Sequence, residues 1–251
     1  MTHAYDGAVA LEWPDPEIAL VRMTRGAEMN TLTWALFDGL AAALDTAARA
    51  TPRAVIVTGT GPAFCGGAHL TYFTDPDSPL TGDAHAVRER YVRRALEVFG
   101  RLPRMACPTI AAINGHAFGG GLELALDCDF RLMSAEARIG LTEARLGVVA
   151  GGNGVQQLHR IVGRAKALEI LLTGTRLTAE EALAAGLVTA VHPAEALECA
   201  AIDFARRFLA CSPVSLAESK RAVYRTETAD RDAANEIALD AVQIAFSSPE
   251  S

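Results

Sequence analysis

One pattern occurs three times in this chain and limits what it can fold into: a short apolar strand, a glycine-rich turn, then the start of a helix. The strands are expected at Ala54–Thr58, Thr109–Ile113 and Phe130–Met133. Apolar runs of this length are typical of strands that are buried on both faces of a sheet. Repeated strand-then-helix units indicate an α/β fold in which helices cover the sheet.

Each strand leads into a stretch that is rich in glycine, and helical periodicity begins where that stretch ends. The expected turns are Gly59–Gly67, Asn114–Gly121 and Ile139–Gly154. The helices that follow are expected to begin near Ala68, to start over Leu122–Leu126, and to cover Val155–Ile161.

The segment before the first repeat predicts two strands and a helix. Val9–Glu12 and Ile18–Met23 are β-rich runs separated by two prolines, which indicates a hairpin or two neighbouring strands. Over Asn30–Ala50 leucines recur every four residues, so an amphipathic helix is expected there. Thr31 or Thr33 is placed to cap its start.

From residue 165 onward the period is helical almost throughout. Helices are expected over Ala165–Leu172, Ala179–Ala185, Ala194–Leu209, Pro213–Tyr224 and Ala233–Phe246. We therefore divide the chain into a core, residues 1–164, and a C-terminal helical region, residues 165–251. The segment Thr74–Gly82 has the composition of an exposed mobile loop, which often borders a pocket.

Composition excludes several classes of protein. Half of the 251 residues are hydrophobic and 21% are charged, which is typical of a globular chain and not of a disordered one. A net charge of −7 without a basic block argues against nucleic acid as a partner. No apolar run approaches the ~18–20 residues that span a bilayer, so no membrane is expected as a partner.

The N-terminus and the cysteines indicate a compartment. The acidic segment 1–17 lacks the features of a signal or transit peptide, so the cytoplasm is expected. The cysteines are five, an odd number, and form no CxxC pair. This pattern favours reduced thiols over a disulfide framework or a zinc site.

The turns 59–67 and 114–121 carry most of the chemistry that the sequence offers. Backbone N–H groups at a helix start lack partners within the helix. If the two helix starts converge, one N–H from each can bind a single carbonyl oxygen and stabilise its developing charge. Two other interpretations are open: the glycines only relieve strain, or they bind phosphate. Gly119–Gly121 has neither the GxGxxG spacing nor a following Lys-Ser or Lys-Thr, so phosphate binding is unsupported.

Glu123 and Glu143 are the candidate acid–base residues. Glu123 lies in the apolar stretch GLELAL, where an ionised side chain is costly. Two carboxylates beside an oxyanion site can act as general acid and general base. The alternative for each is a solvated glutamate whose charge interacts with a helix dipole or with a neighbouring arginine.

Three segments carry a resemblance that covers nearly the whole chain: FCGGAHL at 64–70, NGHAFGGGLE at 114–123, and LTG at 172–174 followed by AGLV at 185–188. In order and spacing they resemble the crotonase superfamily, also called the enoyl-CoA hydratase/isomerase family. The resemblance implies a ClpP/crotonase-like fold, a spiral of ββα units followed by a C-terminal helical region. It also implies assembly through that region, as a homotrimer or a dimer of trimers.

The same resemblance implies the site residues. Ala68 and Gly120 would supply the two N–H groups of an oxyanion hole. Glu143 would exchange the proton at Cα, and Glu123 would orient or activate the water. The implied substrate-binding positions are Gly67, His69, Leu70, Tyr72, Phe118, Gly119 and Gly151. No permanently bound cofactor and no metal is expected, and coenzyme A enters as part of the thioester substrate.

Some residues depart from the family's pattern. His69 stands in place of an Asp and Thr142 in place of a Pro, and the loop AGGNG at 150–154 differs from the common Pro-Gly-x-Gly-Gly. His69 and His116 are interpreted as packing or capping residues rather than as catalysts, and neither has a metal-ligating partner at useful spacing. Further departures occur at Gly26, Ala27, Thr71, Leu122 and Gln157.

Because both glutamates are present, the resemblance favours an enoyl-CoA hydratase that adds water across the 2,3 double bond through an oxyanion-stabilised enolate. Two alternatives stay open. An enzyme of the same fold would use one glutamate to isomerise, cleave or hydrolyse a specialised acyl-CoA. A catalytically silent protein would only bind acyl-CoA.

Overall fold

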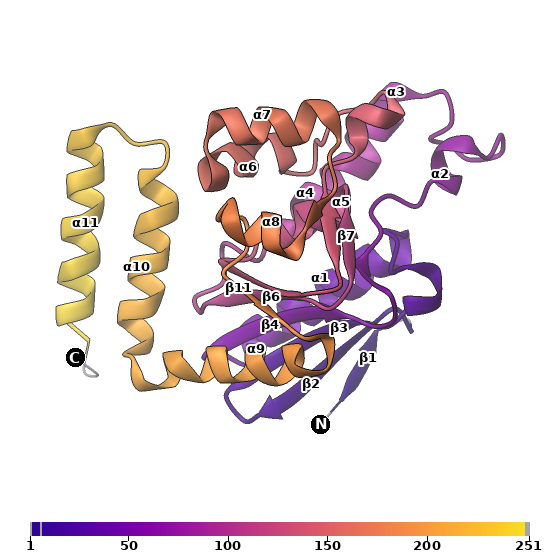
Figure 1. Cartoon of the computed structure of the whole chain (residues 1–251). Coiled ribbons are helices and arrows are strands. Elements are labelled where there is room, and N and C mark those ends of the chain that lie inside the picture. Colours follow the sequence, from indigo (N-terminus) through magenta and orange to yellow (C-terminus); the bar gives the residue numbers. More distant parts are fainter. Residues whose placement is uncertain (1, 6, 249–251) are drawn as a thin grey trace.

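The computed structural model describes residues 2–5 and 7–248 and has the mixed α/β architecture that the sequence predicts (Figure 1). The strands are β1 His3–Tyr5, β2 Val9–Asp15, β3 Ile18–Met23, β4 Ala54–Gly59, β5 Ala63–Cys65, β6 Thr109–Ile113, β7 His116–Phe118, β8 Phe130–Ser134, β9 Arg138–Gly140, β10 Leu177–Thr178 and β11 Ala190–His192. The helices are α1 Trp34–Arg49, α2 Thr71–Thr74, α3 Ala84–Ala86, α4 Arg93–Phe99, α5 Gly120–Leu126, α6 Gly154–Val162, α7 Arg164–Thr173, α8 Ala179–Ala184, α9 Leu197–Arg206, α10 Pro213–Thr226 and α11 Arg231–Phe246.

The larger sheet has the strand order β1-β2-β3-β4-β6-β8-β11. β2 and β3 pair antiparallel, which confirms the expected hairpin. From β3 to β11 every neighbouring pair is parallel. Every residue of β4 and β6 is buried, as the apolar runs predict for strands covered on both faces.

The two faces of this sheet face separate cores, because side chains alternate along a strand. In β3, Ala19 and Val21 belong to the core that includes α1. Ile18 and Leu20 belong to a second core, which they share with α9. The sheet is thus held between α1 on one face and α9 on the other.

The smaller sheet has the order β10-β9-β7-β5 and positions the glycine turns. Its parallel strands β5, β7 and β9 follow β4, β6 and β8 in the chain. The repeated unit is therefore two strands, a turn and, in the second and third units, a helix. Since parallel strands end at the same edge of a sheet, the segments after β5, β7 and β9 lie side by side.

Two expected helices differ in the structure. α1 begins at Trp34 rather than Asn30, because Asn30 has a left-handed φ of +48° and Thr33 caps the helix. The helix expected near Ala68 is only the four-residue α2, which begins at Thr71. Ala68 itself forms a parallel β-bridge with Leu32, so the chain stays extended there.

The sequence analysis leaves residues 83–107 unassigned, and the structure places helices there. α3, a π-helical stretch Val87–Val92 and α4 follow one another without a break. Tyr91, Ala95 and Val98 bury one face of this segment. Their i, i+4, i+7 spacing is the signal that predicts the helix.

The C-terminal region has the five expected helices, α7 to α11, together with two short strands. β10 pairs with β9 and β11 pairs with β8, so this region also completes both sheets. The pair α10 and α11 stands away from the body of the molecule (Figure 1).

A partly buried polar cluster attaches α10 to the sheet. Lys220 Nζ lies 2.6 Å from Asp129 Oδ2 and donates to the carbonyls of Leu102 and Cys107 at 3.0 Å. The Tyr224 hydroxyl donates to Asp129 Oδ1 at 2.8 Å. These partners offset the free-energy cost of removing both charges from water, a cost that would be uncompensated for an unpaired ion.

None of the described helices is long and apolar enough to cross a membrane. All five cysteines have free thiols, as expected, and Cys65, Cys107 and Cys128 are buried.

Candidate active site

Two of the glycine turns meet where β5 and β7 end. Gly67 has a φ of +92°, a conformation that favours glycine. A side chain has no room there, because a Cβ on Gly67 would lie 2.5 Å from the Phe118 carbonyl oxygen and 3.4 Å from the Gly120 nitrogen. The segments that carry Ala68 and Gly120 are therefore direct neighbours.

The amides of Ala68 and Gly120 donate no hydrogen bond to any residue within 2–5 and 7–248. Gly120 opens α5, so its N–H has no acceptor within the helix. Ala68 follows Gly67, whose carbonyl accepts from the Leu32 amide at 2.8 Å. Two adjacent chain segments thus each present an unpaired donor.

Gly121 sets the spacing between these segments. A Cβ on Gly121 would lie 2.0 Å from the carbonyl oxygen of Cys65, which is a backbone atom of β5. Only glycine lets α5 approach β5 so closely.

Glu123 lies in the first turn of α5 and is 5% exposed. Its Oε1 accepts a hydrogen bond from the Gly154 amide at 2.9 Å, and the Gly152 amide also donates to the carboxylate. A Cβ on Gly152 would lie 2.7 Å from Oε2. The loop before α6 therefore holds this carboxylate.

Glu143 follows β9 and opens a short 3₁₀ helix, Glu143–Leu146. Its Oε1 lies 2.9 Å from the Cβ position of Gly119, and its Oε2 is buried without a hydrogen-bond partner among the described residues. Glu123 Oε2 lies 3.7 Å from the Cβ position of Gly120. The two carboxylates therefore face adjacent residues of one turn.

Burial shifts both carboxyl groups toward their protonated forms. Burial raises the pKa of Glu123 to about 8, with Glu143 acting in the same direction and the amides of Gly154 and Gly152 opposing the shift. Burial also raises the pKa of Glu143. Carboxyl groups with raised pKa values are suited to exchange protons with a bound molecule.

The residues after Ala68 belong to an aromatic cluster. His69 Nδ1 lies 3.0 Å from Thr31 Oγ1, and its ring meets the edge of Tyr72. Tyr72 stacks on Trp34. Leu70 points outward and is 56% exposed.

Tyr91 is a site-wall residue that the sequence analysis misses. Its hydroxyl accepts from the His69 amide at 3.3 Å and donates to the Leu32 carbonyl at 2.7 Å. It therefore holds both segments of the Leu32–Ala68 bridge. The unassigned helix at 87–92 is the reason that it escapes notice.

Phe118 ends β7 beside two basic residues. The ring of His116 stacks on it, and the guanidinium of Arg176 lies 4.6 Å from its centre. His116 Nδ1 accepts from the Arg138 amide at 3.1 Å. These contacts agree with a packing role for His116.

Gly151 lies in the loop that holds Glu123, yet the amides on the carboxylate are those of Gly152 and Gly154. A Cβ on Gly151 would meet the side chain of Val92 at 3.4 Å. The sequence analysis singles out only the first glycine of this loop. The run of three glycines within four residues is the signal that points to the other two.

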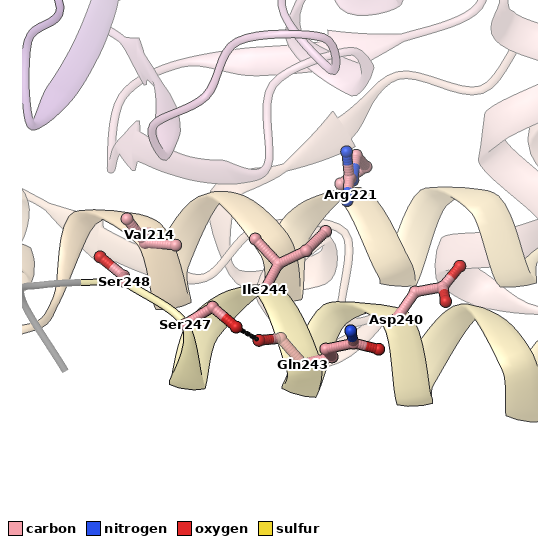
Figure 2. Close-up of a pocket in the computed structure, with 7 residues that line it drawn as sticks. All are labelled: Val214, Arg221, Asp240, Gln243, Ile244, Ser247 and Ser248. Atoms are coloured by element: carbon pink, nitrogen blue, oxygen red, sulfur yellow. Dashed lines mark hydrogen bonds between the residues drawn. The ribbon is translucent and has the colours of Figure 1, made fainter.

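The structure offers no metal centre among the residues that it describes: no group of three or more His, Cys, Asp or Glu side chains is placed to hold an ion. Two pockets also lie elsewhere. One is between α10 and α11 (Figure 2), and the other is between α10 and the sheet, beside Asp129. Neither pocket includes Glu123 or Glu143.

Comparison with known proteins identifies the family. The family model described as enoyl-CoA hydratase/isomerase matches residues 15–250. A Dictyostelium discoideum protein named "Probable enoyl-CoA hydratase, mitochondrial" is 35% identical over 82% of this chain and 72% of its own length. The (E)-benzylidenesuccinyl-CoA hydratase of Thauera aromatica is 38% identical over 68% of this chain and 64% of its own.

Another relative is much longer than this chain. The fatty acid oxidation complex subunit alpha of Pseudomonas aeruginosa is 38% identical over 74% of this chain, and the match spans 26% of the subunit.

Solved structures share the whole fold. The enoyl-CoA hydratase of Bacillus anthracis superposes with a TM-score of 0.89 at 31% identity, over 96% of this chain and 92% of that one. The enoyl-CoA hydratase of Mycobacterium smegmatis superposes with a TM-score of 0.88 at 26% identity, over 96% and 92%. The expected crotonase fold is confirmed, and the chain belongs to the enoyl-CoA hydratase/isomerase family of the crotonase superfamily.

Proposed function

We propose that this protein is an enoyl-CoA hydratase, a hydro-lyase that adds water across the 2,3 double bond of an enoyl-CoA thioester. One observation carries the proposal: two carboxylates with raised pKa values, Glu123 and Glu143, face the turn that bears the unpaired Gly120 amide. Membership of the family supports it. So do the hydratases among the relatives.

In this proposal the amides of Ala68 and Gly120 bind the thioester carbonyl. They stabilise the negative charge that develops on its oxygen as the enolate forms. Loss of one such donor commonly costs ~10² to 10³ in rate, so the pair accounts for a large share of the catalysis. Gly67 and Gly119 leave the space that the thioester needs.

The two glutamates move one proton each. Glu123 takes a proton from the water whose oxygen bonds to C3, and Glu143 gives a proton to C2. Glu123 must therefore start ionised and Glu143 protonated, a state in which the pair shares one proton. Each transfer contributes ~10² to 10⁴ in rate.

We assign the remaining contacts of the substrate to the residues around these turns. His69, Leu70 and Tyr72 follow one proposed oxyanion residue, and Phe118 precedes the other. Gly151 lies in the loop before α6, whose Gly154 amide donates to Glu123. Coenzyme A enters as part of the thioester, and the proposal needs no further cofactor.

We infer that the protein acts in the cytoplasm as a homotrimer or a dimer of trimers formed through residues 165–251. Exposed apolar side chains on α11 support the assembly: Leu239 is 60% exposed and Phe246 is 82% exposed. Apolar surface of this kind gains free energy when a second chain covers it.

Turnover in ¹⁸O-labelled water tests the proposed reaction. We expect one labelled oxygen in a 3-hydroxyacyl-CoA product from at least one member of a panel of enoyl-CoA thioesters. If the product were an isomer of unchanged mass, the reaction would be double-bond migration and not hydration. If no product formed and the Cα proton did not exchange with solvent, the protein would only bind acyl-CoA.

The rate of hydration should depend on the protonation of Glu123. Its pKa is about 8, so at lower pH most of the carboxyl is protonated and cannot take a proton from water. We expect kcat/KM to rise with pH as Glu123 ionises, and to fall at higher pH once Glu143 has lost its proton as well. In Glu143→Gln the neighbouring charge that raises this pKa is gone, so the limb of the residual activity should move to lower pH. Titrations of kcat/KM for both proteins measure this, and an unmoved limb would contradict the assignment.

A further inference from the structure

Asp127 is a buried carboxylate that the proposed reaction does not use. It follows Glu123 by four residues, one turn later on the same face of α5 and its C-cap. It is 2% exposed. Its Oδ2 accepts a hydrogen bond from Asn153 Nδ2 at 2.7 Å, and its Oδ1 is buried without a partner among the described residues.

Asn153 holds an unusual backbone conformation. Its φ is +90°, a region that side chains rarely adopt outside glycine. Glycine would take the same conformation without strain. The loop nevertheless carries an asparagine here, and its side chain reaches Asp127. The side chain thus makes a contact with Asp127 that glycine at this position would lack.

The next residue connects this pair to the proposed site. The Gly154 amide donates to Glu123 Oε1 at 2.9 Å, and the Gly152 amide on the other side of Asn153 donates to the same carboxylate. Asn153 thus lies between the two amides that hold Glu123. Its side chain ties this stretch of loop back to the helix that carries Glu123.

We propose that Asp127 and Asn153 are positioning residues, which hold the Gly152 and Gly154 amides on Glu123 and so keep its carboxylate aimed at the attacking water. The proposal rests on the proposed hydration. It differs from a purely structural role because it ties turnover, and not only stability, to one side-chain hydrogen bond.

The charges around Glu123 predict two opposite effects. Glu143 and Asp127 are the titratable groups whose charges raise its pKa, and Glu123 in turn raises the pKa of the nearby Tyr91 phenol. The Asp127 charge raises the pKa of Glu123, and the loop amides lower it. Removing the charge should lower this pKa, whereas releasing the loop should raise it.

Asn153→Gly separates the side chain from the backbone. Glycine keeps the left-handed conformation but releases Asp127. We expect kcat to fall by about tenfold or more, toward the ~10²-fold that a displacement of about 1 Å costs, with little change in KM. Thr51→Gly is the matched control, because Thr51 also has a left-handed φ, +50°, but is exposed and far along the chain from the site. It should keep wild-type kcat.

Substitutions of Asp127 test the other partner. Asp127→Ala removes the acceptor and should lower kcat as Asn153→Gly does. Since the two residues act as one unit, the double variant should lose no more than either single variant. Asp127→Asn retains an acceptor for Asn153, so it should recover most of the turnover. It should also move the pH limb of kcat/KM to lower pH.

The pKa of Glu123 offers a readout besides activity. Carboxyl ¹³C NMR, assigned with Glu123→Gln, should show a lower pKa in Asp127→Asn and a higher one in Asn153→Gly. Wild-type kcat and an unchanged Glu123 pKa in both Asn153→Gly and Asp127→Ala would overturn the positioning role, even in an active hydratase. Wild-type protein that hydrates nothing while these pKa shifts occur would overturn the proposed function and leave the coupling standing.

Discussion

Glu123→Gln and Glu143→Gln should each lower the kcat of hydration by ~10² to 10⁴, the range that proton transfer by a positioned side chain contributes. Glutamine keeps the size of the side chain and can still accept the Gly154 hydrogen bond at position 123. It cannot take up or release the proton. Steady-state rates on the thioester that wild-type protein hydrates best measure the loss. Glu180→Gln, at an exposed position of α8, is the matched control.

The same substitution of Glu123 should stabilise the fold at alkaline pH. The pKa of Glu123 is raised from an ordinary value of 4.5 to about 8, so the folded chain binds its proton more tightly than the unfolded chain. Stability is therefore lost as pH rises from the lower pKa through the higher one. Glutamine removes that loss, and the midpoint of thermal unfolding at about pH 9 should exceed that of wild type.

The two measurements together separate a catalytic glutamate from a structural one. When a carboxylate that is paired in the fold is replaced, the protein loses stability. A variant with lower turnover and higher alkaline stability than wild type shows the opposite pattern. This pattern is expected when a catalytic group lies in an environment that destabilises its charged form. Near-wild-type turnover in both variants would point to the silent binding protein instead.

The sequence predicts those parts of the fold that depend on local physics. β4 and β6 are apparent because strands buried on both faces need continuous apolar runs. Gly67 and Gly119 are apparent because they lie in glycine-rich turns, and both adopt positive φ angles, which favour glycine. Glu123 is apparent as a lone charge within an apolar helix.

Long-range pairing accounts for what the sequence does not predict. The repeated pattern predicts a helix near Ala68, but Leu32 lies far away in the chain and holds Ala68 extended in a β-bridge. β10 and β11 have only two and three residues, and they exist because β9 and β8 offer them partners. No local periodicity can show strands so short.

The candidate site divides in the same way. Asp127 ends the apolar run of α5 and looks in sequence like a surface residue, yet the loop at 150–154 folds over it. The chemistry of the site is therefore visible in the sequence, but the residues that aim it become visible only when the two segments meet.

Gly121→Ala should impair both folding and turnover, because it acts on the distance between the segments that carry Ala68 and Gly120. The added methyl group would lie 2.0 Å from the Cys65 carbonyl oxygen. Neither atom belongs to a flexible side chain, so α5 must move away from β5. Overpacking of this kind costs about 1–3 kcal/mol of stability. A shift of α5 carries the Gly120 amide away from that of Ala68, and we expect kcat to fall by ~10² to 10³.

Thermal unfolding and steady-state kinetics of the same preparation separate the two effects. Gly186→Ala is the control for adding a methyl group to a glycine, since nothing lies within 4 Å of its Cβ position, although its φ of +70° carries a modest strain. It should lose some stability and no turnover. If folded Gly121→Ala turned over like the control, the spacing of the two turns would have no bearing on the rate. The amides of Ala68 and Gly120 would then not act together on one oxygen, because two donors fixed to separate segments can share an acceptor only while those segments keep their distance.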